Sequence, residues 1–191
     1  MSPLEALMSV ALGIGLAAAV GLRIFLPLLV MSIAAYTGHL KLAASFAWLA
    51  TLPALLMLAV AAVAEVFAYY IPGVDHLLDL IATPTALVAG TIAAAAVMTD
   101  LPPLIKWTTA VIAGGGAAGL TQGVSSLLRI KSTATTGGLG NGVVATGELG
   151  GSLLFSLLAI FAPLFGLALI VILIWLAVKL VRRALLKRST A

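Results

Sequence analysis

Residues 7–36 read LMSVALGIGLAAAVGLRIFLPLLVMSIAAY, and Arg23 is the only charged residue among them. An α-helix needs about 20 apolar residues to cross the hydrocarbon core of a membrane. The stretch is long for one span and contains Gly21 and Pro27. It fits a tilted span, a helix kinked at the proline, or two half-helices forming a re-entrant element. This stretch alone predicts a membrane protein.

The rest of the chain continues the pattern. Hydrophobic residues make up 63% of the 191 residues and charged residues only 8%, whereas soluble domains carry about 25% charged residues. No separate soluble domain is expected beside the spans. We predict one all-α transmembrane domain over residues 1–191. It is a polytopic helix bundle of five spans, at Leu7 to Tyr36, Phe46 to Tyr70, Ala82 to Thr99, Leu104 to Leu128 and Leu149 to Leu180.

Residues with obvious catalytic chemistry are sparse. The chain has no cysteine, which excludes disulfides and thiolate metal sites. His39 and His76 belong to no zinc-binding motif, and no nucleophile elbow or phosphate-binding lysine loop is present. We therefore expect no catalytic residues, no bound metal and no cofactor, and we predict that the protein is not an enzyme.

Cations near the span ends predict the orientation, because cytoplasmic loops are enriched in Lys and Arg. Five spans place Arg129 and Lys131 on one side of the membrane. The opposite side then holds the larger set, which is Lys41, Lys106, Lys179, Arg182, Arg183, Lys187 and Arg188. This asymmetry predicts an outside N-terminus and a cytoplasmic C-terminus. The basic tail is interpreted as a membrane anchor, and no nucleic-acid partner is expected.

An internal repeat is suggested at a constant offset of 100 residues. The matches are Gly15, Ala17, Ala18, Leu28, Ser32 and Gly38 with Gly115, Ala117, Ala118, Leu128, Ser132 and Gly138. The copies would cover 7–71 and 103–183, with a linker span at 72–100. Three crossings between the copies would invert the second, as in many secondary transporters. Chance is an equal alternative, because small residues are common throughout the chain.

Small residues also line two predicted helix faces. Gly115, Gly119 and Gly123 stand four residues apart, and Gly15 lies in a similar line with Ala11 and Ala19. Such faces let helix backbones approach closely in lipid. Helix packing is the favoured interpretation, within the bundle, in a homo-oligomer or against other membrane helices.

Arg23 is the most informative charge, since a charged side chain at the bilayer centre costs at least about 2.5 kcal/mol. An acidic partner would offset that cost. Glu148 is the first choice and Glu65 the second. The alternative is that Arg23 extends its side chain to the membrane interface. We favour these structural roles over direct contact with a substrate.

Two further polar regions offer binding candidates. Asp75 and Asp79 share a helix face and could hold a hard cation, although capping and surface roles are favoured. The Gly/Thr-rich run from Ser132 to Gly147 contains Asn141 and precedes Glu148. It fits a re-entrant binding loop and an ordinary flexible loop equally well.

Three stretches of the chain resemble a family of small bacterial membrane proteins defined only as a domain of unknown function. They are Gly21-Leu22-Arg23 with Phe25 and Pro27; Pro72 with Asp75, Asp79, Pro84 and Gly90; and Thr136-Gly137-Gly138 with Asn141 and Glu148. The resemblance implies a bacterial inner-membrane location and gives no activity. Here Gly142 follows Asn141 where the family pattern has a proline.

Together these patterns favour a protein that moves a small solute or ion, with a binding site drawn from Arg23, Glu65, Asp75, Asp79, Asn141 and Glu148. The alternative is a non-catalytic scaffold whose glycine faces assemble oligomers in the lipid bilayer. A lipid-modifying enzyme, with Asp75, Asp79 and Glu148 around a metal, ranks third. A polar cavity reaching Arg23 or Glu148 would favour the transporter over the scaffold.

Overall fold

The described residues form a bundle of helices, which confirms the predicted all-α class. The computed structural model describes residues 2–71 and 74–188, apart from the side chains of 75, 76, 174, 177, 178 and 180–188. The elements are α1 (Pro3–Val20), α2 (Phe25–Tyr36), the 3-10 helix η1 (Ala44–Ala50), α3 (Leu52–Ala68), α4 (Val74–Val97), α5 (Pro103–Thr109), the π-helix η2 (Ala110–Gly115), α6 (Gly116–Thr136), α7 (Asn141–Phe161) and α8 (Pro163–Arg188).

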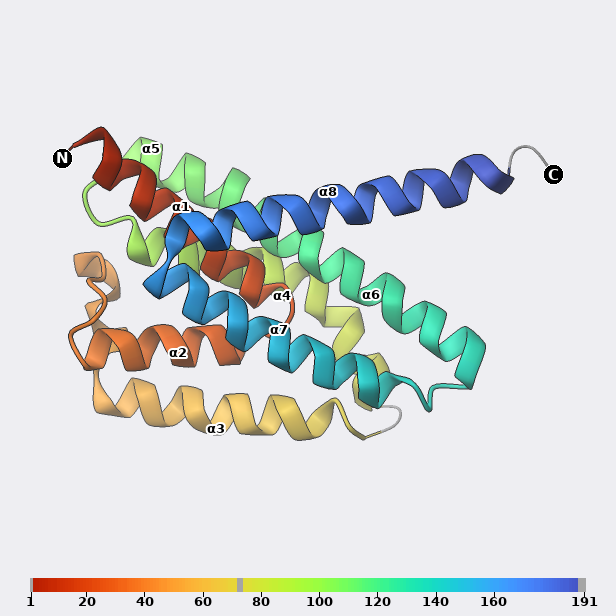
Figure 1. Cartoon of the computed structure of the whole chain (residues 1–191). Coiled ribbons are helices and arrows are strands. Elements are labelled where there is room, and N and C mark those ends of the chain that lie inside the picture. The colour runs from red at the N-terminus through yellow and green to blue at the C-terminus, as the bar shows by residue number, and fades with distance from the viewer. Residues whose placement is uncertain (1, 72–73, 189–191) are drawn as a thin grey trace.

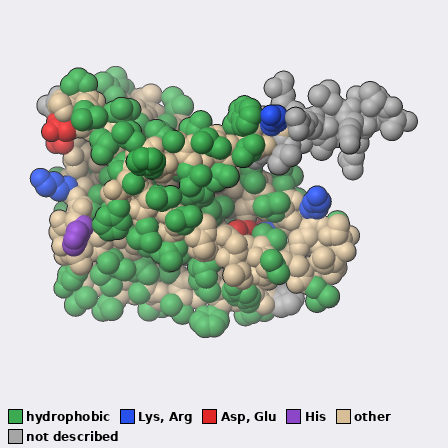
Figure 2. Space-filling view, viewed as in Figure 1, with side chains coloured by type: hydrophobic (Ala, Val, Ile, Leu, Met, Phe, Trp, Pro, Cys, Tyr) green, Lys and Arg blue, Asp and Glu red, His purple; other side chains and the backbone are tan. Residues whose placement is uncertain are grey.

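Among the described residues, four helical segments are long and apolar enough to cross a membrane, and the pair η1 and α3, bent by 69°, makes a fifth if it is one span. The four segments are Pro3–Val20, Leu77–Val97, Pro103–Thr136 and Asn141–Phe161. The predicted number of about five is therefore confirmed. Apolar side chains cover most of the face drawn in Figure 2, as expected for a surface in contact with lipid.

Helix α1 lies at the centre of the bundle and packs against α4, α6, α7 and α8. Small residues make this close contact with several helices feasible. A Cβ on Gly15 would lie 2.7 Å from the Ala159 Cβ on α7, and Gly90 on α4 faces Ala118 on α6. The predicted packing role holds for Gly15, Gly115 and Gly119, which face Ala159, Thr91 and Leu87 respectively. Gly123 has no described neighbour within 4 Å of a Cβ, so a packing role for it within the bundle is not seen.

The predicted first span is two helices. Helix α1 ends at Val20, and α2 begins at Phe25 and runs back toward the end of the bundle where α1 began (Figure 1). At the break, Gly21 lies so close to α6 that a Cβ there would overlap the Thr121 hydroxyl and the Ala118 carbonyl. Pro27 causes no kink, because it lies in the first turn of α2, where a proline removes no hydrogen bond. The stretch is therefore split, as one of the three readings has it, but α1 is itself long enough to cross a membrane and only α2 is short.

The predicted loop at Ser132 to Gly147 is mostly helical, so both the re-entrant and the flexible-loop interpretations are wrong. Helix α6 continues to Thr136, and α7 already begins at Asn141. Gly137 and Gly138 have φ values of 64° and 94°, a backbone conformation that favours glycine. The predicted last span is likewise two helices, because the chain reverses direction at Ala162 between α7 and α8.

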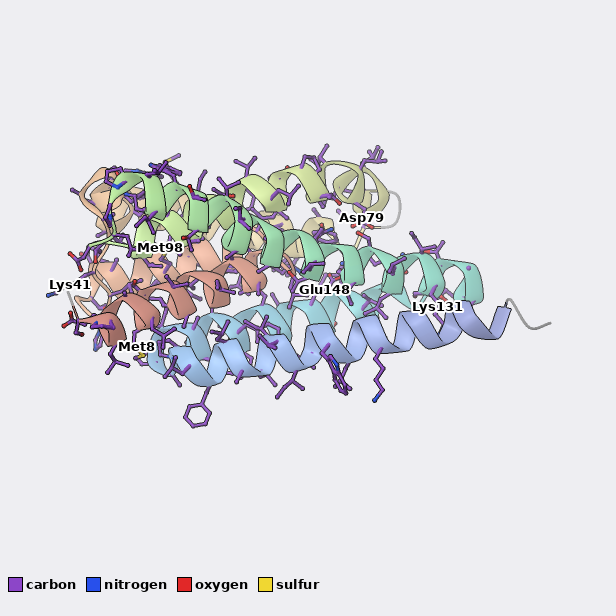
Figure 3. All side chains as sticks on the ribbon, turned by 90° about the horizontal axis from the view of Figure 1, so that it is seen from above. Met8, Lys41, Asp79, Met98, Lys131 and Glu148 are labelled. Atoms are coloured by element: carbon purple, nitrogen blue, oxygen red, sulfur yellow. The ribbon has the colours of Figure 1, made fainter. Side chains whose placement is uncertain are left out.

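These reversals regroup the cations. Lys41 and Lys131 lie at opposite ends of the bundle (Figure 3), which we call the Lys41 end and the Lys131 end. Helix α8 starts at the Lys41 end and runs to the Lys131 end and beyond (Figure 1). The sequence predicts that Lys179 and the basic tail share a side with Lys41 and Lys106. In the structure, Lys179 and the tail instead lie toward Lys131. The termini remain at opposite ends.

The structure does not support the inverted repeat. Ala17 packs near Ala110 and Gly114, and Gly21, further along α1, meets Ala118 and Thr121, further along α6. The two proposed copies therefore run parallel. Their shapes also differ, since the first is broken after Val20 whereas Pro103–Thr136 is continuous. The shared small residues reflect two helices that each need a narrow packing face.

Candidate functional site

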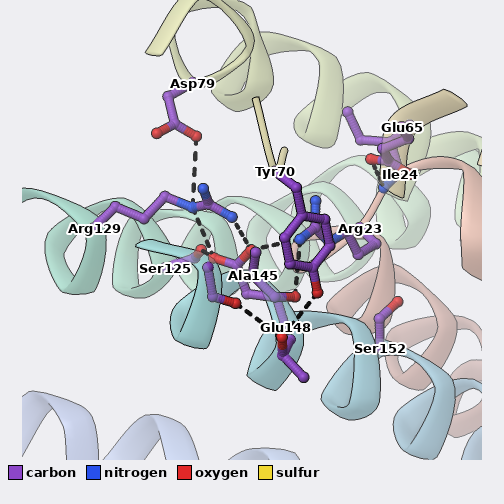
Figure 4. A network of polar contacts seen from close by, with 12 residues as sticks. Arg23, Ile24, Glu65, Tyr70, Asp79, Ser125, Arg129, Ala145, Glu148 and Ser152 are labelled. Carbon is purple, nitrogen blue, oxygen red and sulfur yellow. Dashed lines mark hydrogen bonds and ion pairs between the residues drawn. The ribbon is translucent and has the colours of Figure 1, made fainter. Parts of the chain in front are cut away.

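The break between α1 and α2 places Arg23 in a buried cluster of charges built from segments far apart in the sequence. Arg129 comes from α6, Glu148 from α7 and Asp79 from α4, and Tyr69 directly follows α3. Figure 4 shows Arg23, Arg129 and Asp79 around Glu148. Side chains of Arg23, Arg129 and Glu148 are at most 5% exposed. Burial of this kind is costly unless the charges are paired.

Arg23 pairs with α7, which confirms Glu148 as its partner. Its Nη2 donates to the Ala145 carbonyl at 2.9 Å and lies 3.3 Å from Glu148 Oε2. The Arg23 side chain does not reach the membrane interface, since only 1% of it is exposed. The two interactions tie the end of α1 to α7.

Glu148 is shared between the two arginines. Arg129 donates from Nε to Glu148 Oε1 at 2.9 Å and from Nη2 to Oε2. The Ser125 hydroxyl donates to Oε1 as well. The carboxylate therefore accepts charge-assisted hydrogen bonds from the Arg129 guanidinium and the Ser125 hydroxyl and forms an ion pair with Arg23.

Tyr69 lies between the two guanidiniums. The Arg23 and Arg129 Cζ atoms are 3.9 Å and 4.3 Å from the centre of its ring. The ring offers its negative face to both cations.

The acceptors described in the cluster do not satisfy every guanidinium N–H group. Arg23 Nε and Nη1 and Arg129 Nη1 are buried and find no hydrogen-bond acceptor among the described residues. Unsatisfied buried donors are rare in native structures, and those of charged groups are the most costly. The cluster therefore has more buried donors than the described side chains satisfy.

Glu65, the second predicted partner, serves a different group. Its Oε1 and Oε2 accept from the Ile24 and Phe25 amides at 2.8 and 3.0 Å. These amides lie at the N-terminus of α2, where N–H groups lack helical partners and a negative charge is favoured. Glu65 on α3 thus fixes the return of the chain after Arg23.

Of the other predicted binding residues, one belongs to the cluster. Asp79 Oδ1 lies 3.8 Å from Arg129 Nε and so belongs to the cluster. Asn141 exchanges hydrogen bonds with Thr133 across the α6–α7 turn, at 3.2 Å from its Nδ2 and 3.4 Å from its Oδ1. The side chain of Asp75 lies outside the described residues. Within those residues, no three His, Asp or Glu side chains gather as a metal would require.

Two grooves flank the cluster. The first, of about 450 Å³, lies between α6 and α7, and its lining includes Leu22, Ser125, Lys131 and Glu148. The second, of about 440 Å³, lies between α3 and α4, and its lining includes Ile24, Glu65 and Tyr69. Arg23 lies between Leu22 and Ile24 in the chain, so the α1–α2 break contributes a wall to each groove. We call them the Glu148 groove and the Glu65 groove.

The sequence interpretation missed Arg129, Ser125 and Tyr69. Arg129 was placed outside the membrane because α6 was ended too early. A helical spacing could have corrected this, since the buried polar residues of α6 are Gln122, Ser125 and Arg129. Helix α7 has a matching buried line of Asn141, Glu148, Ser152 and Ser156. Polar residues at such intervals indicate helices that pack their polar faces inward.

Comparison with known families gives one match. A family model described as "Domain of unknown function (DUF4126)" covers residues 10–183. Neither the curated proteins nor the solved structures provide a match.

Proposed function

The chain belongs to the DUF4126 family, and we propose that it is a non-enzymatic carrier of a small solute or ion across the membrane. The Arg23–Arg129–Glu148 cluster is its binding site. The family supplies no activity, so the proposal rests on the cluster and the grooves beside it. The inverted repeat forms no part of it.

One observation carries the proposal: Glu148 belongs to the buried cluster and also lines the Glu148 groove. A cluster made only to hold helices together needs no groove at its central acid. Intramembrane charges facing a cavity are a common mark of substrate and ion pathways. The volume of about 450 Å³ falls within the range of about 300–1,000 Å³ typical of small-ligand sites.

The α1–α2 break supports the same role. Transporters often place binding sites where helices are discontinuous, because free helix ends present backbone groups and partial charges. Arg23 lies at the C-terminal end of α1, and α2 directs its first amides at Glu65. The broken segment lines both grooves, through Leu22 in the Glu148 groove and Ile24 in the Glu65 groove.

We further propose a bacterial inner membrane, with the Lys131 end facing the cytoplasm. The basic tail of α8 extends toward that end, and cations mark the cytoplasmic side. The C-terminus is then inside and the N-terminus outside, which is the orientation predicted from the sequence. The α6–α7 turn, which the sequence places outside, is then on the cytoplasmic side.

The test is solute flux into proteoliposomes, across a panel of inorganic ions, organic anions and cations, and neutral metabolites. Wild-type vesicles should accumulate at least one class faster than empty vesicles. Arg23→Ala and Glu148→Gln should reduce that flux at least tenfold, whereas Lys41→Gln, an exposed charge at the far end, should leave it unchanged. Wild-type vesicles no leakier than empty ones across the panel would rule out the carrier.

A scaffold is the second candidate, favoured by one face of α6. Gly116 and Gly123 have no neighbour within 4 Å of a Cβ, and Leu120 and Leu127 are more than half exposed. A helix of a second copy or of another membrane protein could pack there closely. A cysteine at Gly123 that forms disulfide-linked dimers in membranes would support such an oligomer.

A further inference from the structure

Building on the proposed transport function, we infer that the Glu148 groove takes a small organic monocarboxylate, which displaces the Glu148 carboxylate from the two arginines as Glu148 takes up a proton. Glu148 is then the built-in stand-in for the carboxylate of the solute. The groove beside it accommodates the apolar part of the solute.

The geometry of the cluster already fits a carboxylate. Glu148 accepts from Arg129 Nε and Nη2 through separate oxygens, and Arg23 Nη2 reaches the same group at 3.3 Å. Arginine holds planar carboxylates in this paired manner. Glu148 lines the groove and the arginines do not, so a carboxylate in the groove reaches these donors when Glu148 moves aside.

The unsatisfied donors of the two arginines also support a carboxylate ligand. Arg23 Nε and Nη1 and Arg129 Nη1 are buried N–H groups without an acceptor among the described residues. They belong to side chains of which at most 4% is exposed. An entering carboxylate brings two oxygens, each able to accept more than one hydrogen bond. The protonated Glu148 keeps a carbonyl oxygen as an acceptor, so the solute and Glu148 together offer more acceptors than the Glu148 carboxylate alone.

The residues that line the groove determine which solutes fit beside the carboxylate. Its walls include Leu22, Val124, Leu128 and Val144, and Ser125 lies beside Glu148. Lys131 lines the groove too and lies at the Lys131 end (Figure 3), where it attracts anions. A cation at the mouth, apolar walls and buried guanidiniums behind Glu148 suit a short amphiphilic anion better than a sugar or a metal ion.

The net charge of the buried cluster explains why a proton is taken up with the solute. The groups around Glu148 are Arg23 at the helix break, Arg129 on α6, Asp79 on α4 and the neutral Tyr69 after α3, with Glu65 on α3 beside Arg23. Ionised, the two arginines and three acids sum to a charge of −1. A second carboxylate would bring this to −2 in a buried site, which is costly. A proton on a Glu148 oxygen restores −1, so solute and proton enter together.

The experiment measures binding of radiolabelled butyrate to the purified full-length protein at about pH 6 and about pH 8, where butyrate stays largely ionised. Wild type should bind butyrate more tightly at the lower pH, by up to about tenfold per pH unit for one linked proton. Unlabelled butyramide and butylamine, which lack the carboxylate, should not compete. Equal affinity at both pH values, or competition by butyramide, would overturn the inference on the unaltered protein.

Variants separate the roles. Glu148→Gln imitates the protonated acid and should bind butyrate at both pH values as tightly as wild type does at the lower one. Arg129→Gln/Glu148→Gln removes the charges of both side chains, and should lose binding. Lys41→Gln is the matched control. A Glu148→Gln protein that folds but does not bind butyrate would show that Glu148 is itself a ligand group and not a stand-in.

The two proposals can fail separately. If butyrate binds as expected but no solute enters vesicles, the carrier function fails and the carboxylate site stands. If vesicles transport other solutes and butyrate does not bind, the carboxylate inference fails and the carrier stands.

Discussion

Arg129 on α6 and Glu148 on α7 form a paired contact, in which two nitrogens of the guanidinium donate to separate oxygens of the carboxylate. The pair joins the helices on either side of the α6–α7 turn at a point where both side chains are buried. Arg23 contacts the same carboxylate from the α1–α2 break. Glu148 therefore links three segments, and the effect of removing it tests the whole arrangement.

Arg129→Gln should destabilise the protein more than any exposed charge change, because it removes the strongest partner of a buried acid. Breaking such a pair costs about 3–5 kcal/mol. The Arg129→Gln/Glu148→Gln double variant should recover part of the loss, because no unpaired acid remains. Thermal unfolding in detergent measures both, and Lys41→Gln should shift stability by less than about 0.5 kcal/mol. A single variant as stable as wild type would contradict the importance of the pair.

Gly21→Ala should prevent normal folding, because its Cβ would overlap the Ala118 carbonyl and the Thr121 hydroxyl on α6. The backbone of α6 would have to move. Gly116→Ala is the matched control, since a Cβ there meets nothing within 4 Å and alanine favours helix by up to about 1 kcal/mol. The yield of monodisperse protein in size-exclusion chromatography separates them. Equal yields would mean that the approach of α1 to α6 is looser than described.

Glu65→Ala should loosen the start of α2, because the Ile24 and Phe25 amides lose their shared acceptor. Loss of a side-chain cap costs about 0.5–2 kcal/mol. Glu65→Gln keeps one carbonyl oxygen and should lose less. Faster hydrogen exchange at residues 24–28, with α7 unaffected, is the expected signature. Exchange that accelerates throughout the bundle would instead assign Glu65 a global role.

Cysteine labelling tests the orientation in a chain that has no cysteine of its own. An impermeant thiol reagent added to intact cells should label a cysteine at Gly38, at the end of α2, and miss one at Leu139, which is 91% exposed in the α6–α7 turn. Permeabilised cells should show both. The reverse pattern would place the Lys131 end outside.

The sequence predicts the class of fold and the key pair well for physical reasons. Apolar runs and scarce charges require helices in lipid. The cost of an unpaired guanidinium limits Arg23 to a small number of partners, and Glu148 was the first of them. These inferences depend on the residue types themselves, which the sequence gives directly.

The course of the chain between those residues was harder to predict. The hydropathy of residues 7–36 is continuous across the break, where Gly21 makes a tertiary contact with α6. The Gly/Thr-rich run looked like a loop because glycine and threonine have low helix propensity. In the structure much of the run is exposed, yet it is helical up to Thr136 and again from Asn141, and the Thr146 hydroxyl lies 2.8 Å from the Tyr70 hydroxyl. Contacts of this kind cannot be read from local composition.

The position of Arg23 near the start of the chain sets the order in which the protein can be completed. It is separated by 122 residues from Ala145, the carbonyl that it contacts. Ribosomes add about 5–20 residues per second, so the arginine emerges on the order of ten seconds before its partner helix exists. During that interval the guanidinium has neither Ala145 nor Glu148 and must stay hydrated or near lipid head groups. The α1–α2 hairpin therefore reaches its final depth only after α7 is made, and a chain truncated before α7 should be recognised and degraded as incomplete.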